Sequence, residues 1–357
     1  MMLKALVLAG GKGTRLRPIT HTSAKQLIPI ANKPILFYGL EAIAKTGIKQ
    51  VGIVVGDTQA EIRAAVGTGA QFGLKVSYIP QKAPLGLAHA VKISRKFIGT
   101  SPFLMFLGDN LLKDSLVPLV KDFAQRKPNA QILVAKIPNP QQFGVVEMQG
   151  ESVVRLVEKP KEPKSDLALV GVYMFDKTIF GAVSRIRPSA RGELEITDAI
   201  QRLVDDKRLV IAKRIDGWWK DTGKLEDLLE VNRLILEGLE PSVDPEASVD
   251  DKSKVEGRVV IQEGAHVAHS IIRGPAIIGK NSRISRSYVG PFTSIYHDVS
   301  VEDSEIEHSI VLENARIHEI KRVQDSLIGQ RVEVRRSLSV PNAYRIMVGD
   351  SSRVEVP

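Results

Sequence analysis

Short apolar runs alternate with helical patterns along the first two thirds of the chain. We expect strands over 3–9, 51–56, 75–79, 103–107 and 131–136, and helices over 35–44, 59–66, 88–97 and 116–126. This alternation predicts an α/β fold with a Rossmann-like, mostly parallel sheet and helices on both faces. Ligands of such sheets bind at the carboxyl ends of the strands, so the loops that follow strands are the places to search for chemistry.

The last third of the chain has a different period. A helix expected over 224–237 and a linker over 238–242 are followed by β-branched residues at every sixth position. These residues are Val243, Val249, Val255, Ile261 and Val267, and, after a slip of one position, Ile272, Ile278 and Ile284. A six-residue period is the hexapeptide repeat of a parallel β-helix, whose β-branched residues point inwards and stack. We therefore expect two domains, 1–237 and 238–357. We also expect a homo-oligomer assembled through the β-helix, because its edges need covering.

Composition narrows the class of protein. The chain has no cysteine, which excludes disulfides and fits a cytoplasmic location. It lacks an apolar run of roughly 18 residues and begins with a predicted strand, so we expect neither a membrane span nor a secretory leader. The formal net charge is +9, but the basic residues are dispersed and aromatic residues make up only 5%. We expect no nucleic-acid partner and attribute the local clusters of cations to a small anionic substrate.

The first predicted strand ends in a glycine-rich turn, Gly10-Gly11-Lys12-Gly13. Glycines let backbone N–H groups converge on a phosphate, and four cations lie nearby in the sequence. They are Lys12, Arg15, Arg17 and Lys25. The turn is not a mononucleotide-binding loop, because Lys12 is followed by glycine, and not a dinucleotide-binding loop, because Leu16 stands where the third glycine is needed. This combination predicts a site for a polyphosphate.

Two aspartates follow other predicted strands or turns. Asp109 follows the apolar strand 103–107 after one glycine, and Asp221 follows the pair Trp218-Trp219. Such carboxylates suit Mg²⁺, which takes one or two of them together with substrate phosphates. Taken alone, Asp109 would more often be a helix cap or turn residue than a metal ligand.

Longer motifs resemble a known family. The string Gly-Gly-x-Gly-Thr-Arg-Leu-x-Pro, followed by Lys-Gln-Leu-Ile-Pro-Ile, resembles the signature of the sugar-phosphate nucleotidylyltransferases. Ala-Pro-Leu-Gly-Leu-Ala-His-Ala, with Leu85 where short thymidylyltransferases usually carry an acid, resembles the long-form glucose-1-phosphate thymidylyltransferases. The later segments Phe-Gly-Val-Val, Glu-Lys-Pro and Gly-Val-Tyr follow in the family's order. The resemblance implies a nucleotidylyltransferase domain followed by a left-handed parallel β-helix.

The resemblance also implies substrates and roles. The reaction would join dTTP and glucose 1-phosphate with Mg²⁺ as cofactor. The phosphate of the sugar is already ionised, so it would attack the α-phosphate of dTTP without a general base. Arg15 and Lys25 would be catalytic, and Asp109 and Asp221 would bind the metal. The nucleotide would contact Leu8, Ala9, Gly10, Gly11, Gly13, Thr14, Gln81, Pro84, Gly86 and Asp109. The sugar phosphate would contact Asn110, Gly144, Glu158, Lys159, Gly171 and Arg191.

Three alternatives remain open from the sequence. One is a nucleotidylyltransferase that uses UTP or a purine nucleotide. Another is a bifunctional enzyme whose β-helix also transfers an acyl group from CoA, with one of its histidines as a base: His266, His269, His297, His308 or His318. The third is a non-catalytic regulator that senses sugar nucleotides. Glu193, Glu195 and Asp198 have a simple interpretation as loop and helix-start acids.

Overall fold

The computed structural model describes residues 3–11, 13–338 and 343–356. The chain forms two compact units. Unit 1 comprises Met1–Lys12, Ser23–Leu27 and Ile35–Asp221, and unit 2 comprises Gly13–Thr22, Ile28–Pro34 and Thr222–Pro357. The glycine-rich turn is therefore divided between the two units.

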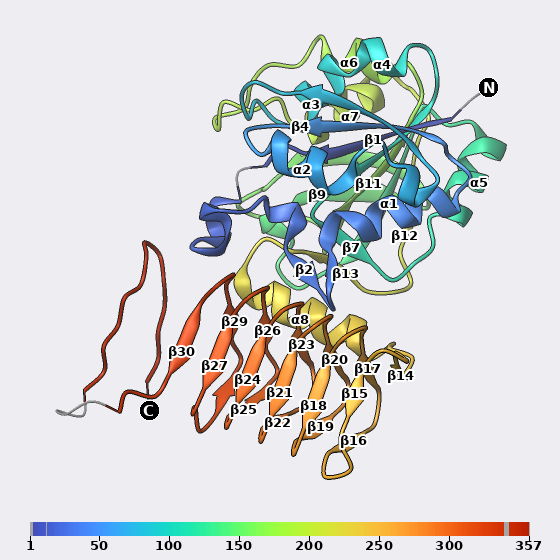
Figure 1. Cartoon of the computed structure of the whole chain (residues 1–357). Helices are drawn as coiled ribbons and strands as arrows, with labels where there is room; N and C mark the ends of the chain where they lie inside the picture. Colours follow the sequence, from blue (N-terminus) through green and yellow to red (C-terminus); the bar gives the residue numbers. More distant parts are fainter. Residues whose placement is uncertain (1–2, 12, 339–342, 357) are drawn as a thin grey trace. The chain divides into compact units, whose positions relative to one another are not determined.

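Unit 1 is built on a nine-stranded sheet (Figure 1). In spatial order its strands are β5 (Lys75–Pro80), β4 (Gln50–Val55), β1 (Lys4–Ala9), β6 (Phe103–Leu107), β11 (Leu167–Phe175), β8 (Ala130–Lys136), β12 (Val210–Arg214), β10 (Ser152–Glu158) and β9 (Gly144–Gln149). All of these strands except β10 and β11 run in one direction, since β11 pairs antiparallel with β6 and β8, and β10 with β12 and β9. The prediction of a mostly parallel α/β sheet is confirmed.

Helices cover both faces of this sheet. They are α1 (Ile35–Lys45), α2 (Gln59–Val66), α3 (Leu87–Ile93), α4 (Arg95–Ile98), α5 (Val117–Arg126), α6 (Ile179–Val183) and α7 (Ile196–Asp205). The helix expected over 88–97 is wrong as a single element. It is interrupted at Ser94, whose hydroxyl donates to the Ala90 carbonyl at 2.7 Å. Such bonding to the preceding turn competes with the helical ladder.

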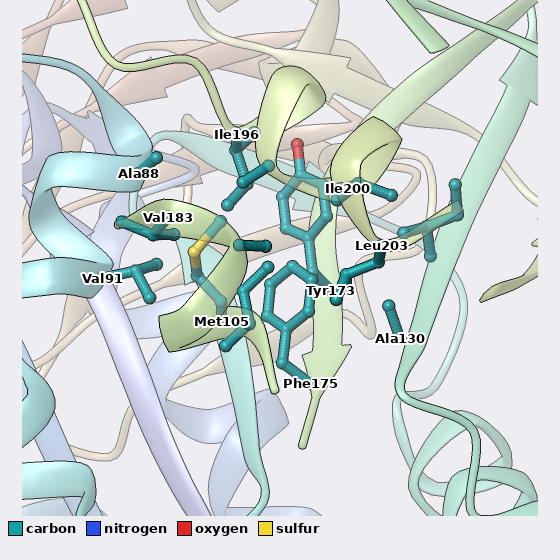
Figure 2. Packing of buried hydrophobic residues seen from close by; sticks show 14 of the residues in the cluster. Ala88, Val91, Met105, Ala130, Tyr173, Phe175, Val183, Ile196, Ile200 and Leu203 are labelled. Atoms are coloured by element: carbon teal, nitrogen blue, oxygen red, sulfur yellow. The ribbon is translucent and has the colours of Figure 1, made fainter. Parts of the chain in front are cut away.

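Two apolar layers hold the sheet between these helices. On one face, Tyr173 and Phe175 of β11 pack against Ile196, Ile200 and Leu203 of α7, as Figure 2 shows. The α7 residues recur at helical spacing, so that they form one apolar stripe. On the other face, alternate residues of β1 and β11 pack against α1. Strands buried on both faces appear in the sequence as continuous apolar runs, as observed for β1.

Two small antiparallel pairings accompany the sheet strands. In unit 1, β7 (Asn110–Leu112) pairs with β13 (Trp219–Asp221), which sets Asn110 opposite Asp221. In unit 2, β2 (Pro29–Ile30) pairs with β3 (Lys33–Pro34). The β2–β3 hairpin follows Lys25–Leu27 directly in the chain.

Unit 2 contains the predicted left-handed parallel β-helix, preceded by helix α8 (Leu225–Leu236). Its three parallel sheets are visible in Figure 1 as stacked short strands. The first sheet consists of β14 (Ser242–Val243), β17 (Val259–Ile261), β20 (Ala276–Ile278), β23 (Thr293–Ile295), β26 (Ile310–Val311) and β29 (Leu327–Ile328). The second consists of β15 (Ser248–Val249), β18 (His266–Ala268), β21 (Arg283–Ser285), β24 (Ser300–Glu302), β27 (Arg316–His318) and β30 (Glu333–Arg335). The third consists of β16 (Lys254–Glu256), β19 (Ile271–Arg273), β22 (Tyr288–Val289), β25 (Glu305–Glu307) and β28 (Val323–Gln324).

Stacked apolar residues fill the β-helix. Val267, Ile284 and Val301 lie above one another in register and are fully buried. At the first coil, Val243 and Val255 are in register with the buried Ile261 and Ile272 but are themselves 52% and 37% exposed. These two residues lie on the terminal rung, which has a neighbouring coil on one side only.

Among the described residues, none of the helices combines the length and apolar character needed to cross a membrane.

Candidate functional site

The end of β1 meets the ends of the neighbouring strands very closely. A Cβ placed on Gly56, just after β4, would lie 2.7 Å from the Gly10 carbonyl oxygen. A Cβ on Gly10 would lie 3.4 Å from the Gln81 side-chain oxygen Oε1. Leu8 and Ala9 lead into this turn as buried strand residues. A side chain at position 56 would collide with the Gly10 carbonyl, and Gln81 lies beside the first glycine of the turn.

The loop after β5 is tied to the segment that precedes α7. The Leu194 N–H donates to the Leu85 carbonyl at 2.8 Å, and the Ala88 N–H donates to the Leu194 carbonyl at 3.0 Å. Gly86 has a φ of 98° and passes so close to Leu194 that a Cβ would lie 2.4 Å from its carbonyl oxygen. Any other residue would be strained and would clash. Pro84, two residues earlier, is exposed on the same loop.

Lys25, Asp109 and Asp221 come together although they are far apart in the sequence. The Lys25 ammonium lies 2.5 Å from Asp109 Oδ2 and 3.7 Å from Asp221 Oδ1, and Lys25 is only 6% exposed. Burial alone would raise the pKa of Asp109. The adjacent Lys25 ammonium outweighs this effect and holds that pKa below its ordinary value. The Asp109 carboxylate is therefore ionised at neutral pH, and both carboxylates face one cation.

This arrangement fits a magnesium ion. Two carboxylate oxygens that converge on one ammonium are also within reach of one metal ion, and Mg²⁺ prefers oxygen ligands from one or two carboxylates together with phosphates. In the part of the chain that the structure describes, no group of three or more His, Asp or Glu side chains is arranged so that it could hold a metal ion. The remaining ligands of a bound ion would therefore come from substrate and water.

Asn110 connects Asp109 to β11 and to the second tryptophan. Its amide nitrogen donates to Asp109 Oδ1 at 2.9 Å, and its oxygen accepts from the Gly171 N–H at 3.2 Å and from the Trp219 indole N–H at 2.6 Å. A Cβ on Gly171 would lie 2.5 Å from the Asn110 oxygen. Asn110 is 2% exposed, so in this structure its side chain orients Asp109.

A second polar cluster forms around Glu158. Its carboxylate accepts from Thr197 Oγ1 at 3.1 Å and from the Arg191 guanidinium at 3.1 Å. Arg191 also donates to both oxygens of Glu195 at 2.9 Å, and Glu195 is 4% exposed. Burial and the Glu195 carboxylate raise the pKa of Glu158 above its ordinary value. A Cβ on Gly144 would lie 3.3 Å from Glu158 Oε2, which brings that predicted residue to the same place.

The predicted cation Lys159 continues directly from this cluster. Its backbone adopts a φ of 43° and its N–H donates to the Phe143 carbonyl at 3.0 Å. The side chain is exposed. Lys159, Arg191 and Glu158 together offer two cations and a carboxylate, which suit a phosphate and sugar hydroxyls.

Arg15 belongs to unit 2, with Gly13 and Thr14. Gly13 takes a φ of 63°, and its carbonyl accepts from the Thr20 hydroxyl at 2.7 Å. The Arg15 guanidinium lies over Gly223, where a Cβ would be 3.2 Å from either terminal nitrogen. Thr14 and Arg15 are exposed. Lys12 lies outside the described residues.

Sequence reasoning missed three residues of the site. Glu195, interpreted as a loop acid, is a buried partner of Arg191, and the four-residue spacing of the pair was the available signal. Gln26, 2% exposed, has a side-chain oxygen without a hydrogen-bond partner among the described residues, so it offers an acceptor to a ligand. His89 of α3 contacts Gln81, which follows β5, at 2.9 Å, and no motif indicated this contact.

The sequence left open a catalytic base among the histidines of the β-helix. Four of them lie beside carboxylates: His269 by Asp250 at 3.0 Å, His297 by Asp298 at 2.7 Å, His318 by Glu302 at 3.7 Å, and His308 by Asp325. The histidines of these pairs are exposed or half-buried. Within the described residues they form no common site.

Comparisons with known proteins agree with this geometry. The nucleotidyl transferase family matches residues 4–238. Over 99% of both chains, the protein is 56% identical to a glucose-1-phosphate thymidylyltransferase of Streptomyces griseus. It is 41% identical to the low-salt glycan biosynthesis nucleotidyltransferase Agl11 of Haloferax volcanii, over 99% of this chain and all of that one. A solved UDP-glucose pyrophosphorylase with UDP-glucose superposes with a TM-score of 0.61 at 26% identity, covering 67% of this chain and all of the other.

Proposed function

Because this chain belongs to the nucleotidyl transferase family, we propose that it transfers a thymidylyl group from dTTP to glucose 1-phosphate, giving dTDP-glucose and pyrophosphate. The observation that carries the proposal is the convergence of Asp109 and Asp221 on Lys25 beside the loops that end the parallel strands. The relative named a glucose-1-phosphate thymidylyltransferase, 56% identical over nearly the whole chain, supports the choice of substrates.

The reaction is a single displacement at the α-phosphorus of dTTP. An oxygen of the sugar phosphate forms a bond to that phosphorus while the bond to the bridging oxygen of the leaving pyrophosphate breaks. The attacking phosphate is already ionised at neutral pH, so no side chain has to remove a proton. The protein's task is to align the reactants and to neutralise the charge that develops. Lys25 does this at the bridging oxygen, and Arg15 at the transferring phosphate and leaving pyrophosphate.

Asp109 and Asp221 would hold Mg²⁺. The ion supplies charge neutralisation and polarisation of the triphosphate oxygens. Asn110 fixes the Asp109 carboxylate through a 2.9 Å hydrogen bond, and Lys25 keeps it ionised, so the chain prepares these ligands in advance. Because an ammonium is already paired with both carboxylates, metal binding competes with an existing interaction.

The remaining predicted residues divide between the two substrates. We assign the nucleotide to the loop that contains Gly10, Gly11 and Gly13 and to the loop from Gln81 to Gly86. We assign the sugar phosphate to the cluster around Glu158, in which Lys159 and Arg191 hold the phosphate. At Gly144 a Cβ would lie 3.3 Å from Glu158 Oε2, which supports this assignment, because a larger residue there would disturb the cluster. We assign Gly171 to the sugar phosphate as well, although its neighbour is Asn110, 2.5 Å from where a Cβ would be.

We further propose that residues 1–237 form the catalytic domain and residues 238–357 a β-helix domain through which copies of the chain associate. The terminal rungs of the β-helix support this, since Val243 and Val255 are exposed there. The absence of cysteine supports a cytoplasmic location.

The experiment that tests the function is pyrophosphate release with glucose 1-phosphate and Mg²⁺, with dTTP, UTP, ATP, GTP and CTP offered in parallel. A preference for dTTP supports the proposal. Strong activity with UTP or a purine nucleotide keeps the chemistry and changes the substrate. No activity with any nucleotide and any sugar 1-phosphate overturns it.

A further inference from the structure

The side-chain amide of Gln81 is held at its nitrogen. Nε2 donates to the Gly86 carbonyl at 3.3 Å, and the same nitrogen lies 2.9 Å from Nδ1 of His89 on α3. A primary amide nitrogen carries two hydrogens, and these two contacts use both of them. The Gln81 nitrogen therefore has no hydrogen left for a ligand.

The orientation of this amide follows from the acceptor on one side of it. The Gly86 carbonyl can only accept, so an amide turned the other way would place two oxygens against each other. Nδ1 of His89 must then accept the second N–H, which places the ring hydrogen on Nε2. Burial and the Lys92 ammonium lower the pKa of His89 below its ordinary value, so the ring is neutral at neutral pH and can accept.

The Gln81 oxygen is the atom that remains available. Oε1 lies over the first glycine of the loop after β1, 3.4 Å from where a Cβ on Gly10 would be. The Gln81 side chain thus offers a nucleotide base a hydrogen-bond acceptor and no hydrogen-bond donor. Thymine and uracil present a ring N–H at position 3, whereas cytosine has an unprotonated nitrogen there, which would face the oxygen lone pairs.

We propose that His89 is a positioning residue that fixes the Gln81 amide with its oxygen toward the nucleotide, so that the site selects a base with a ring N–H over cytosine. The inference rests on the proposed function and deepens it. Without an acceptor at position 89, one N–H of Gln81 has no partner, and only the 3.3 Å hydrogen bond to the Gly86 carbonyl still holds the amide. This single long hydrogen bond no longer fixes the amide, which then also adopts orientations that place a donor toward the base. Cytosine then finds a partner for its ring nitrogen.

The test compares UTP with CTP, because these nucleotides differ only at positions 3 and 4 of the base. We would measure kcat/KM for each by pyrophosphate release with glucose 1-phosphate, using the full-length protein. In the wild type UTP is strongly preferred. In His89→Leu, which has no acceptor, the ratio of UTP to CTP falls by about tenfold or more, the effect expected of one misplaced hydrogen bond. His89→Asn keeps an acceptor near the position of Nδ1 and restores most of the ratio.

Controls separate positioning from general damage. His266→Leu makes the same substitution at an exposed position of the β-helix and leaves the ratio unchanged. If His89→Leu does not fold, His89→Met repeats the measurement with a side chain that also lacks a nitrogen acceptor. An active, folded His89→Leu or His89→Met protein with the wild-type ratio overturns the inference. A wild type inactive with every nucleotide instead overturns the proposed function, and the two failures are therefore distinguishable.

Discussion

Replacing Lys25 with methionine removes the cation that Asp109 and Asp221 share. Methionine keeps most of the length of the lysine stem, so little packing is lost at this 6% exposed position. The two carboxylates are then left facing each other without the ammonium. The variant therefore isolates the charge of Lys25 from its shape.

The size of the effect follows from the geometry. The ammonium lies 2.5 Å from Asp109 and 3.7 Å from Asp221, and these carboxylates are 27% and 25% exposed. Breaking a fully buried pair costs about 3–5 kcal/mol. Because water reaches both carboxylates here, we expect about 2 kcal/mol without metal. Loss of one charge contact to the transition state lowers kcat by about 10²- to 10³-fold.

Thermal unfolding with and without Mg²⁺, together with pyrophosphate release, measures both effects. Lys25→Met unfolds at a lower temperature than the wild type without metal. Mg²⁺ then raises its unfolding temperature more than it raises that of the wild type, because the metal no longer competes with an ammonium. Lys213→Met, an exposed lysine on β12, is the matched control. Equal unfolding temperatures, an equal effect of Mg²⁺ and retained turnover would refute the reasoning.

Three further variants test other parts of the account. Arg15→Ala lowers kcat by about 10²- to 10³-fold. Its unfolding temperature is unchanged, because the Arg15 side chain is exposed. Near-full turnover in a folded variant would contradict the catalytic role of Arg15. Asn232→Leu removes three hydrogen bonds, two of them buried, including the one from the Ala31 N–H at 2.9 Å. It costs about 2–4 kcal/mol in denaturant unfolding, and a loss under about 0.5 kcal/mol would contradict this expectation. Glu195→Gln removes a charge that raises the pKa of Glu158. A carboxyl whose pKa is raised in the native state destabilises the fold as pH rises from the ordinary pKa of 4.5 through the raised pKa. The variant therefore shows a smaller decline in stability over that pH range and a lower Glu158 pKa in an NMR titration. An unchanged Glu158 pKa would exclude the Glu195 charge as the cause.

The sequence was sufficient for features that depend on local pattern. The two different periods of the apolar residues predicted both architectures, and β6 (Phe103–Leu107) and α2 (Gln59–Val66) have the expected bounds. The strand-end position of Asp109 was also visible, because strand ends can be recognised from a short apolar run.

Features that depend on distant partners were not predictable. The insertion of the antiparallel strand β11 between β6 and β8 depends on pairings between residues far apart in the chain. The exposure of Val243 follows from the absence of a further coil beside it, which a repeat pattern cannot indicate. His89 and Glu195 gain their roles only from side chains that other elements bring to them.

The central claim is that this site uses positive charge to transfer a nucleotidyl group directly, without a nucleophile on the protein. The measurement that tests it most directly is the stereochemical course at the α-phosphorus, using dTTP with a chiral sulfur substitution at that atom and glucose 1-phosphate as acceptor. The account predicts inversion of configuration in the sugar nucleotide. Retention would require two displacements and a nucleotidylated protein, and would contradict the account.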